Sequence, residues 1–297
     1  MLDVIIVGGS SAGLSAALIL GRSRRNVLMF DDSKPCNRFS HASHGFLTRD
    51  GVRPADLLQI AREQLAPYES VTRRSATVAH VSRIEGGFRV ETEAGDVHTA
   101  RKLLLATGLK DTLPSLDGIE PFFGTSVFHC PYCDGWEVRD QPIVVYNESE
   151  IAFHQAMMLH QWTHDLTLCT GGASVLTDEE RARLQKNAIT LNETPAVRVE
   201  GSNGSVERLI FADGSAIQCA AIFVRLTSSQ RTPFAQQLGC ALNENGLVLV
   251  DASAQTTVAG VYAAGDMANP IRSVAIAVAH GATAAYHINR VLISEDF

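Results

Sequence analysis

The sequence contains few cysteines, few aromatic residues and no long uninterrupted apolar run. Six cysteines in 297 residues are too few for a disulfide scaffold. Aromatic residues make up 6% of the chain and charged residues 19%, against 45% hydrophobic residues. This balance is typical of a folded globular protein and excludes a disordered or coiled-coil chain. The length favours two packed domains.

Positive charge is also scarce, since the net charge is −7 and Lys and Arg form no long runs. No binding surface for nucleic acid or anionic lipid is therefore expected. No stretch reaches the roughly 18 apolar residues that a membrane span needs. The apolar residues 1–20 lack a cationic start and are interrupted by glycine, which argues against a signal peptide. We expect a soluble, cytoplasmic protein with no nucleic-acid and no membrane partner.

Alternation of strand and helix patterns predicts an α/β fold with two Rossmann-like, three-layer domains. A β-α-β unit opens the chain, and a loop rich in His, Asn, Ser and Gly follows it. A cluster of Pro and Gly at 114–124 indicates a linker. We expect a discontinuous nucleotide-binding domain at 1–114 and 243–297, and a smaller domain inserted at 115–242. Further elements are expected as strands at 77–84, 87–92, 97–105, 143–146, 166–169, 221–226, 247–250 and 260–266, and as helices at 54–65, 150–161, 178–186 and 273–292.

The first β-α turn has the pattern of a dinucleotide site, with residues Gly8-Gly9-Ser10-Ser11-Ala12-Gly13 between a strand and a helix. Backbone amides at such a helix start face a pyrophosphate, and Asp31 stands where an acidic residue binds the adenosine ribose. A second segment ending in Gly265-Asp266 favours FAD over NAD, because its carboxylate can reach a ribityl hydroxyl. The alternatives are ordinary β-α turns and a capping Asp.

Three segments resemble the signatures of low-molecular-weight thioredoxin reductases: Ala264-Gly265-Asp266, Ala106-Thr107-Gly108 and Cys130-Pro131-Tyr132-Cys133-Asp134-Gly135. Residues 44–51 and 133–140 are more similar to a branch with the dithiol oxidases of gliotoxin and holomycin biosynthesis. The resemblance implies a homodimer with FAD held by Gly8, Ser10, Ser11, Ala12, Gly13, Asp31, Asn37, Arg38, His44, Gly45, Thr107, Gly108, Gly265, Asp266, Ser273 and Val274.

Cys130 and Cys133 are the only closely spaced cysteines. Two thiols at a helix start can close a small disulfide, and the helix dipole favours the reactive thiolate. A zinc site would need two more ligands, for which His129 and one distant residue do not suffice, so no metal is expected. The other cysteines are expected to be small buried hydrophobes: Cys36, Cys169, Cys219 and Cys240.

The resemblance also implies roles at the cysteine pair. Cys133 would exchange electrons with the flavin at its C4a position, and Cys130 would react with the outside thiol or disulfide. Asp134 would move the proton, with a helix cap as the alternative role. Three histidines could serve either this site or the structure, and the structural role is favoured for each: His44, His129 and His280.

The second domain lacks the glycine-rich turn that binds NADPH in the family. Its turn has Asn147, Glu148 and Ser149, and Glu150 follows, so side chains and negative charge occupy the pyrophosphate position. No basic pair follows the next strand, which ends near Cys169. We therefore expect FAD as the cofactor and NADPH not to be used.

Three interpretations of the electron flow remain. In the first, a small dithiol is oxidised and oxygen accepts the electrons. In the second, a disulfide such as that of a thioredoxin-like protein is reduced with electrons from ferredoxin, or from a second flavin or other carrier in the vacated cleft. In the third, the protein is a flavin-bound redox sensor or interaction module.

Overall fold

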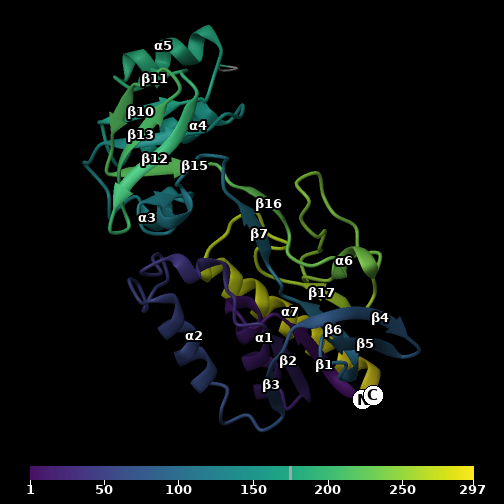
Figure 1. Ribbon diagram of the computed structural model, residues 1–297. Helices are drawn as coiled ribbons and strands as arrows, with labels where there is room; N and C mark the ends of the chain where they lie inside the picture. The colour runs from purple at the N-terminus through teal and green to yellow at the C-terminus, as the bar shows by residue number, and fades with distance from the viewer. Residues whose placement is uncertain (174–175) are drawn as a thin grey trace. The chain divides into compact units, whose positions relative to one another are not determined.

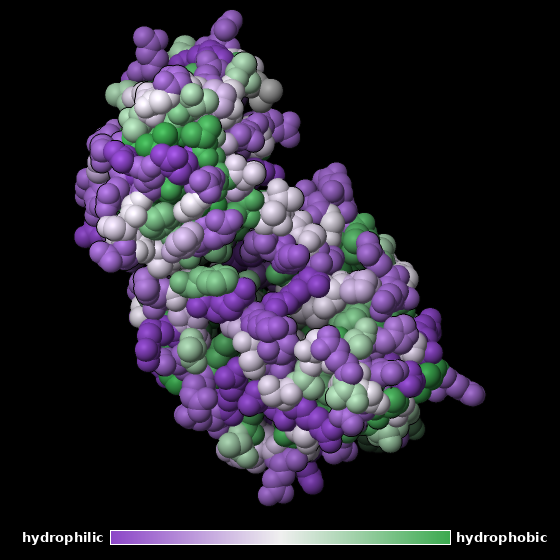
Figure 2. Space-filling view, viewed as in Figure 1, coloured by the Kyte–Doolittle hydropathy of each residue, from purple (hydrophilic) through white to green (hydrophobic). Residues whose placement is uncertain are grey.

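The computed structural model describes residues 1–173 and 176–297, which form two compact units. The first unit comprises residues 1–38, 45–110 and 228–297, and the second comprises 39–44 and 111–227. Both are α/β, as predicted (Figure 1). Within the described ranges, no helix is long and apolar enough to span a membrane. The face in Figure 2 is mostly hydrophilic, with hydrophobic residues in small groups.

A seven-stranded mixed sheet organises the first unit. Its parallel part has the order β3-β2-β1-β6, and β6 is long enough to pair β5 along its first half and β17 along its second. The strands are β1 (Leu2–Val7), β2 (Val27–Asp31), β3 (Val71–Ser75), β4 (Val78–Ile84), β5 (Gly87–Thr92), β6 (Val97–Leu105) and β17 (Val261–Ala263). The helices are α1 (Ser11–Arg22), α2 (Pro54–Glu63), α6 (Phe234–Gln237) and α7 (Val274–Asp296), with the 3-10 turn η1 (Cys36–Phe39) at the unit's edge.

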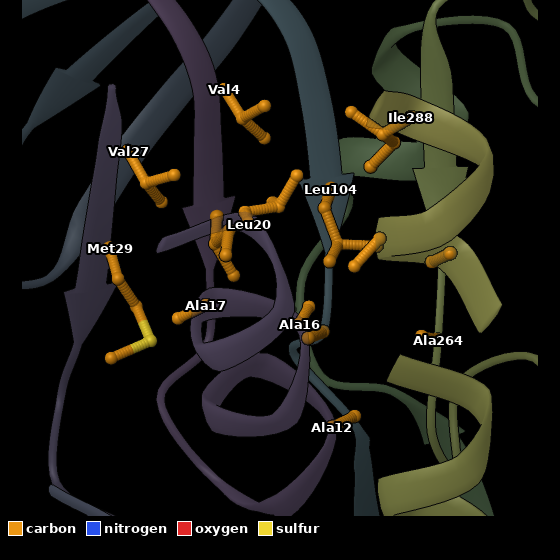
Figure 3. Close-up of a cluster of buried hydrophobic side chains, with 14 of the residues drawn as sticks. Val4, Ala12, Ala16, Ala17, Leu20, Val27, Met29, Leu104, Ala264 and Ile288 are labelled. Carbon is orange, nitrogen blue, oxygen red and sulfur yellow. The ribbon is translucent and has the colours of Figure 1, made fainter. Parts of the chain in front are cut away.

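Successive residues of β1 are buried on opposite faces of this sheet, because strand side chains alternate. Val4 and Ile6 pack in the cluster with α1 and α7, drawn in Figure 3. Ile5 and Val7 pack on the other face with Phe234 of α6 and the chain that follows it. Two buried faces explain why β1 is an almost uninterrupted apolar run.

The second unit has a five-stranded parallel sheet in the order β11-β10-β9-β15-β8. Helices α4 and α5 contribute to the core on one face, and the antiparallel sheet β12-β13-β14 covers the other. The strands are β8 (Val127–Phe128), β9 (Ile143–Tyr146), β10 (Leu166–Cys169), β11 (Thr190–Asn192), β12 (Ala196–Ser202), β13 (Ser205–Phe211), β14 (Ala216–Gln218) and β15 (Ala221–Val224). The helices are α3 (Pro131–Asp134), α4 (Ala152–Leu159), α5 (Asp178–Lys186) and the 3-10 turn η2 (Glu120–Phe122).

The chain passes between the units through β7 (Leu109–Thr112) and β16 (Thr227–Gln230), which pair with each other. The compact units therefore change near residues 110 and 228, whereas the sequence indicated 114 and 243, and the short segment 39–44, which the sequence assigned to the first domain, belongs to the second unit. Residues 228–242 belong to the first unit because Phe234, Leu238 and Cys240 are buried in its core.

The strand predicted at 247–250 is wrong. This segment forms only isolated bridges, in which Val248 pairs with Leu242 and Val250 with Thr256. Its amides donate to separated parts of the chain, from Val248 to Met267 and from Leu249 to Ala241, so no continuous ladder develops. The helix predicted at 150–161 is shorter and comprises α4 alone.

Candidate functional site

The first β-α turn packs so closely that only glycine fits at two of its positions. A Cβ on Gly8, whose φ is +114°, would lie 2.1 Å from the Ala106 carbonyl oxygen. A Cβ on Gly13 would lie 1.9 Å from the Gly8 carbonyl oxygen. The turn thus brings strand β1 and helix α1 together with an unencumbered backbone, which suits close approach of a pyrophosphate. Ser10 is the N-cap residue of α1, and Ser11 is its first residue.

Segments far apart in the sequence converge on this turn. Ala106 touches Gly8, and the Gly265 Cβ position lies 3.1 Å from the Cβ of Ala12. The Thr107 hydroxyl lies 3.6 Å from the sulfur of Met267, directly after Asp266. Gly108 follows with φ of +69°. The fold therefore gathers three of the sequence signatures in one place.

Asp31 ends β2 beside the same turn and is 6% exposed. Its carboxylate accepts a hydrogen bond from Arg62 at 3.2 Å and forms an ion pair with Arg73 at 3.5 Å. The Nε atom of Arg62 is buried without a hydrogen-bond partner. Because a buried donor of this kind is costly to leave unpaired, Arg62 is suited to a bound polar group or water. The sequence carried no signal for Arg62.

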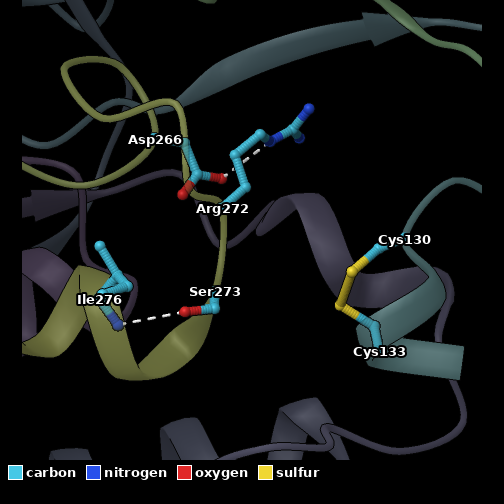
Figure 4. The surroundings of a disulfide bond; sticks show 6 residues. All are labelled: Cys130, Cys133, Asp266, Arg272, Ser273 and Ile276. Atoms are coloured by element: carbon cyan, nitrogen blue, oxygen red, sulfur yellow. Dashed lines mark hydrogen bonds and ion pairs between the residues drawn. A yellow bond between two sulfur atoms is a disulfide. The ribbon is translucent and has the colours of Figure 1, made fainter. Parts of the chain in front are cut away.

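Asp266 follows β17, and its Oδ2 atom lies 3.4 Å from Nε of Arg272 (Figure 4). The same oxygen lies 3.8 Å from the sulfur of Cys36, so η1 with Asn37 and Arg38 borders this carboxylate. Ser273 caps α7 by accepting a hydrogen bond from the Ile276 amide at 3.2 Å, and Val274 begins the helix. The side-chain NH2 group of Gln230 donates to the Met267 carbonyl oxygen. Its Oε1 atom, like Arg62 Nε, is buried without a hydrogen-bond partner among the described residues.

These features fit a flavin dinucleotide in the first unit. We call the turn of residues 8–13 the glycine cradle; its close-packed backbone suits a pyrophosphate, and Asp31 and Asp266 supply carboxylates at two points of its border. Two buried polar atoms there, Arg62 Nε and Gln230 Oε1, have no hydrogen-bond partner among the residues that the structure describes. Gly45 is also in this unit, with φ of +72°, and its amide donates to Asp50 at 2.8 Å.

Cys130 and Cys133 form a disulfide in the second unit, with 5.3 Å between their Cα atoms (Figure 4). Cys130 is the N-cap residue of α3, and the Cys133 amide donates to its carbonyl oxygen at 3.1 Å. Pro131 stands at the first helical position, where its missing N–H costs nothing. The local chain thus presents both sulfurs from one short turn of helix.

Asp134 has an altered proton affinity beside the disulfide. Burial, and to a smaller extent the nearby Glu137 carboxylate, raises the pKa of Asp134 to about 7, while His44 opposes the shift. His44 lies in the second unit, where its Nε2 atom is 3.4 Å from Glu137 Oε1. Asp134 can therefore hold or release a proton near neutral pH. Glu137 was missed in the sequence, although its spacing of three residues from Asp134 was a signal.

The β9-α4 turn of the second unit is filled by its own side chains. Asn147 is 1% exposed, and its amide donates to Gln155 at 2.8 Å while its oxygen accepts from Ser149. Glu148 accepts a hydrogen bond from the Tyr146 hydroxyl. Its carboxylate lies against Gly171, where a Cβ would be 2.2 Å from Oε1. The Ser149 amide is therefore already bonded to Asn147, and side chains occupy this turn where a glycine-rich turn leaves its backbone open.

The other candidate residues lie in surroundings that indicate structural roles. His280 accepts a hydrogen bond from the Gly265 amide at 3.3 Å, and burial lowers its pKa. The His129 ring lies 6.4 Å from that of Phe123. Three of the other cysteines are buried as expected, but Cys36 is exposed because η1 buries none of its residues. Among the described residues, no cluster of three or more His, Cys, Asp or Glu could hold a metal ion.

The comparisons agree with this arrangement. The model of the pyridine nucleotide-disulphide oxidoreductase family matches residues 2–281. The Bacillus anthracis protein TrxB is 32% identical over all of both chains, with a TM-score of 0.96. An oxidoreductase from Agrobacterium tumefaciens is 36% identical over 99% of each chain, with a TM-score of 0.94. The thioredoxin reductase aclD of Aspergillus oryzae is 29% identical over 96% of this chain and 94% of its own length.

The family match covers nearly the whole chain and includes both the glycine cradle and the disulfide. It implies FAD as the resident cofactor, and it confirms the resemblance to thioredoxin reductases. The chain belongs to the pyridine nucleotide-disulphide oxidoreductase family, as a thioredoxin reductase-like flavoprotein disulfide oxidoreductase.

Proposed function

We propose that the protein moves electrons between FAD and an outside dithiol or disulfide through Cys130 and Cys133, and that NADPH is not its electron donor. The observation that carries the second part is the filled β9-α4 turn. Asn147 and Ser149 satisfy each other, so their side chains occupy the space that glycines leave open for a pyrophosphate. The Glu148 carboxylate adds repulsion at the same place.

The thiol chemistry follows from the exchange reaction. A substrate thiolate attacks the Cys130 sulfur, and the bond to Cys133 breaks so that Cys133 leaves as a thiolate. The second substrate thiolate then attacks the mixed disulfide, which releases oxidised substrate and the Cys130 thiolate. Asp134, with its pKa near 7, is suited to accept a substrate proton or to protonate a leaving thiolate. FAD, when bound, supplies the two-electron partner of the resulting dithiol.

The proposed FAD-binding residues are the sixteen named from the sequence. The signature turn, Thr107, Gly108 and Asp266 are supported by their convergence in the first unit. His44 is better supported as a partner of Glu137 and Asp134, since all three lie in the second unit. We also propose a homodimer, which rests on the family resemblance.

For the electron flow, we favour oxidation of a small dithiol with oxygen as the final acceptor, since residues 44–51 and 133–140 are similar to dithiol oxidases. The second candidate is reduction of a small disulfide or a thioredoxin-like protein, with electrons from ferredoxin, a second flavin or another carrier. A redox-sensor role requires the same disulfide but no turnover.

Anaerobic stopped-flow mixing of the yellow protein with NADPH, dithiothreitol or reduced ferredoxin tests these alternatives. We expect dithiothreitol to bleach the flavin and NADPH to do so slowly or not at all. Crowding and repulsion at the turn each cost on the order of a kcal/mol or more, which together weaken nucleotide binding by roughly thirtyfold or more. Flavin bleaching within milliseconds at micromolar NADPH would overturn the proposal. Reoxidation by oxygen after dithiol reduction distinguishes an oxidase from a sensor.

A further inference from the structure

Exposed aromatic side chains gather beside the disulfide in the second unit. Tyr132, between the two cysteines, is 75% exposed, and Trp136, three residues after Cys133, is 64% exposed. The chain has two tryptophans, and the second, Trp162, places its ring centroid 5.6 Å from that of Tyr132 in an edge-on contact. Trp162 thus lies against the segment that carries the redox pair, and Trp136 follows that segment in the sequence.

Packing fixes two of these rings. Trp162 lies against α3 so closely that a Cβ on Gly135 would be 3.1 Å from its indole. The Arg139 guanidinium lies 4.0 Å from the Trp136 ring centroid, and it donates to the Trp136 carbonyl oxygen at 2.6 Å. Rings that are already positioned lose little side-chain entropy when a ligand stacks on them.

A second run of rings leads to Cys130. His129, its chain neighbour, lies 6.4 Å from Phe123, and Phe123 lies 6.0 Å from Phe39 between ring centroids. Phe39 is 49% exposed. We call Phe39, Phe123, Tyr132, Trp136 and Trp162 the aromatic rim. Phe39 and Phe123 precede the disulfide in the sequence, Tyr132 lies between its cysteines, and Trp136 and Trp162 follow it.

Charge near the rim is mainly negative. Two carboxylates follow the disulfide within ten residues, at Glu137 and Asp140, against the single guanidinium of Arg139, and Asp134 adds a third negative charge once its proton is lost near pH 7. The Glu137 carboxylate also has His44 nearby, at 3.4 Å. Such a border disfavours anionic dithiols by like-charge repulsion and tolerates neutral ones.

We propose that the aromatic rim binds the ring system of a neutral, aromatic small-molecule dithiol or of its cyclic disulfide. This inference rests on the proposed function and narrows its substrate class. A single aromatic side chain buries about 150–250 Å², so stacking between a few rings is enough to hold a small flat molecule.

The test compares two uncharged dithiols with the FAD-loaded protein under anaerobic conditions. 1,2-Bis(mercaptomethyl)benzene carries a ring and dithiothreitol does not, while both have alkyl thiols, so their intrinsic exchange reactivity is similar. We expect the half-saturating concentration for flavin bleaching to be at least tenfold lower for the aromatic dithiol. Meso-2,3-dimercaptosuccinate, an anionic dithiol, should require a higher concentration than dithiothreitol.

The double variant Tyr132→Ala with Trp136→Ala should reduce this preference to about threefold or less, whereas Trp136→Phe, which retains a ring, should preserve most of it. Tyr286→Ala removes an exposed aromatic ring from α7 in the first unit and serves as the matched control. Equal half-saturating concentrations in the unmodified protein, or an unchanged preference in the double variant, would overturn the inference. A double variant that lost turnover with a thioredoxin-like protein but kept its turnover with the aromatic dithiol would also overturn the inference. If no dithiol bleaches the flavin, the proposed function itself fails.

Discussion

Gly281 of α7 contacts the backbone of α1 at Ala12, where a Cβ on the glycine would lie 2.0 Å from the Ala12 carbonyl oxygen. The hydroxyl of Ser15 donates to the Val278 carbonyl oxygen at 2.7 Å in the same helix pair. The C-terminal helix is therefore part of the structure that holds the glycine cradle. Residues more than 260 positions apart in the sequence cooperate in forming one end of the candidate flavin site.

Gly281→Ala should destabilise the first unit, because the added methyl group forces α1 and α7 apart. Overpacking of this kind costs about 1–3 kcal/mol. Thermal unfolding followed by circular dichroism should show a clearly lower midpoint. Gly172→Ala is the control, since no atom of residues 1–173 or 176–297 lies within 4 Å of that Cβ position. Equal midpoints for the two variants would contradict the close packing.

Asp266→Ala should weaken FAD retention, since it removes the carboxylate that faces Arg272 beside the signature turn. The protein should purify yellow, and the variant should lose flavin on dialysis or gel filtration. Asp213→Ala, in an exposed turn where the carboxylate accepts hydrogen bonds from Ser215, should keep its flavin. Colourless protein that takes up no flavin on reconstitution would count against FAD binding.

Cys130→Ser should leave Cys133 as a thiolate next to the oxidised flavin and produce a long-wavelength absorbance band. Cys133→Ser should lack the band, because the resemblance places Cys133 nearer the flavin. Both variants should lose thiol-linked turnover, since neither can close the disulfide. Absorbance spectra and dithiol turnover measure the two effects. Full turnover in both variants would make the pair structural.

Asp134→Asn should lower thiol turnover about a hundredfold or more, within the range of general acid–base catalysis. The unmodified protein should show a change in rate near pH 7, where the buried carboxyl loses its proton, and the variant should not. Since the folded-state pKa is raised, the folded state retains the proton longer than the unfolded state. The contribution to stability therefore falls as pH rises from about 4 to 7. Denaturant unfolding should show that the free energy of unfolding depends less steeply on pH across this range in Asp134→Asn than in the unmodified protein.

A homodimer is expected from the family resemblance. Sedimentation or light scattering at micromolar concentration should give twice the 32.0 kDa mass of one chain. A mass of one chain at that concentration would refute this prediction.

The sequence by itself determined the features that depend on neighbours along the chain. The strand, glycine turn and helix at residues 2–22 were predictable, because apolar runs and glycines act locally. The spacing of Cys130 and Cys133 likewise indicated their disulfide. The absence of glycine from the turn after β9 could be read directly from the sequence, because it is a change of residue type.

Tertiary structure decided which distant residues meet. It placed His44 beside Glu137, and thereby near Asp134, although they are more than 90 positions apart. It also brought Trp162 against Tyr132 and left Cys36 exposed next to Asp266. No periodic pattern encodes such contacts, because they depend on how sheets and helices pack and on where loops are buried. The proton affinity of Asp134 follows from that packing, since burial and nearby charges arise only in the folded chain.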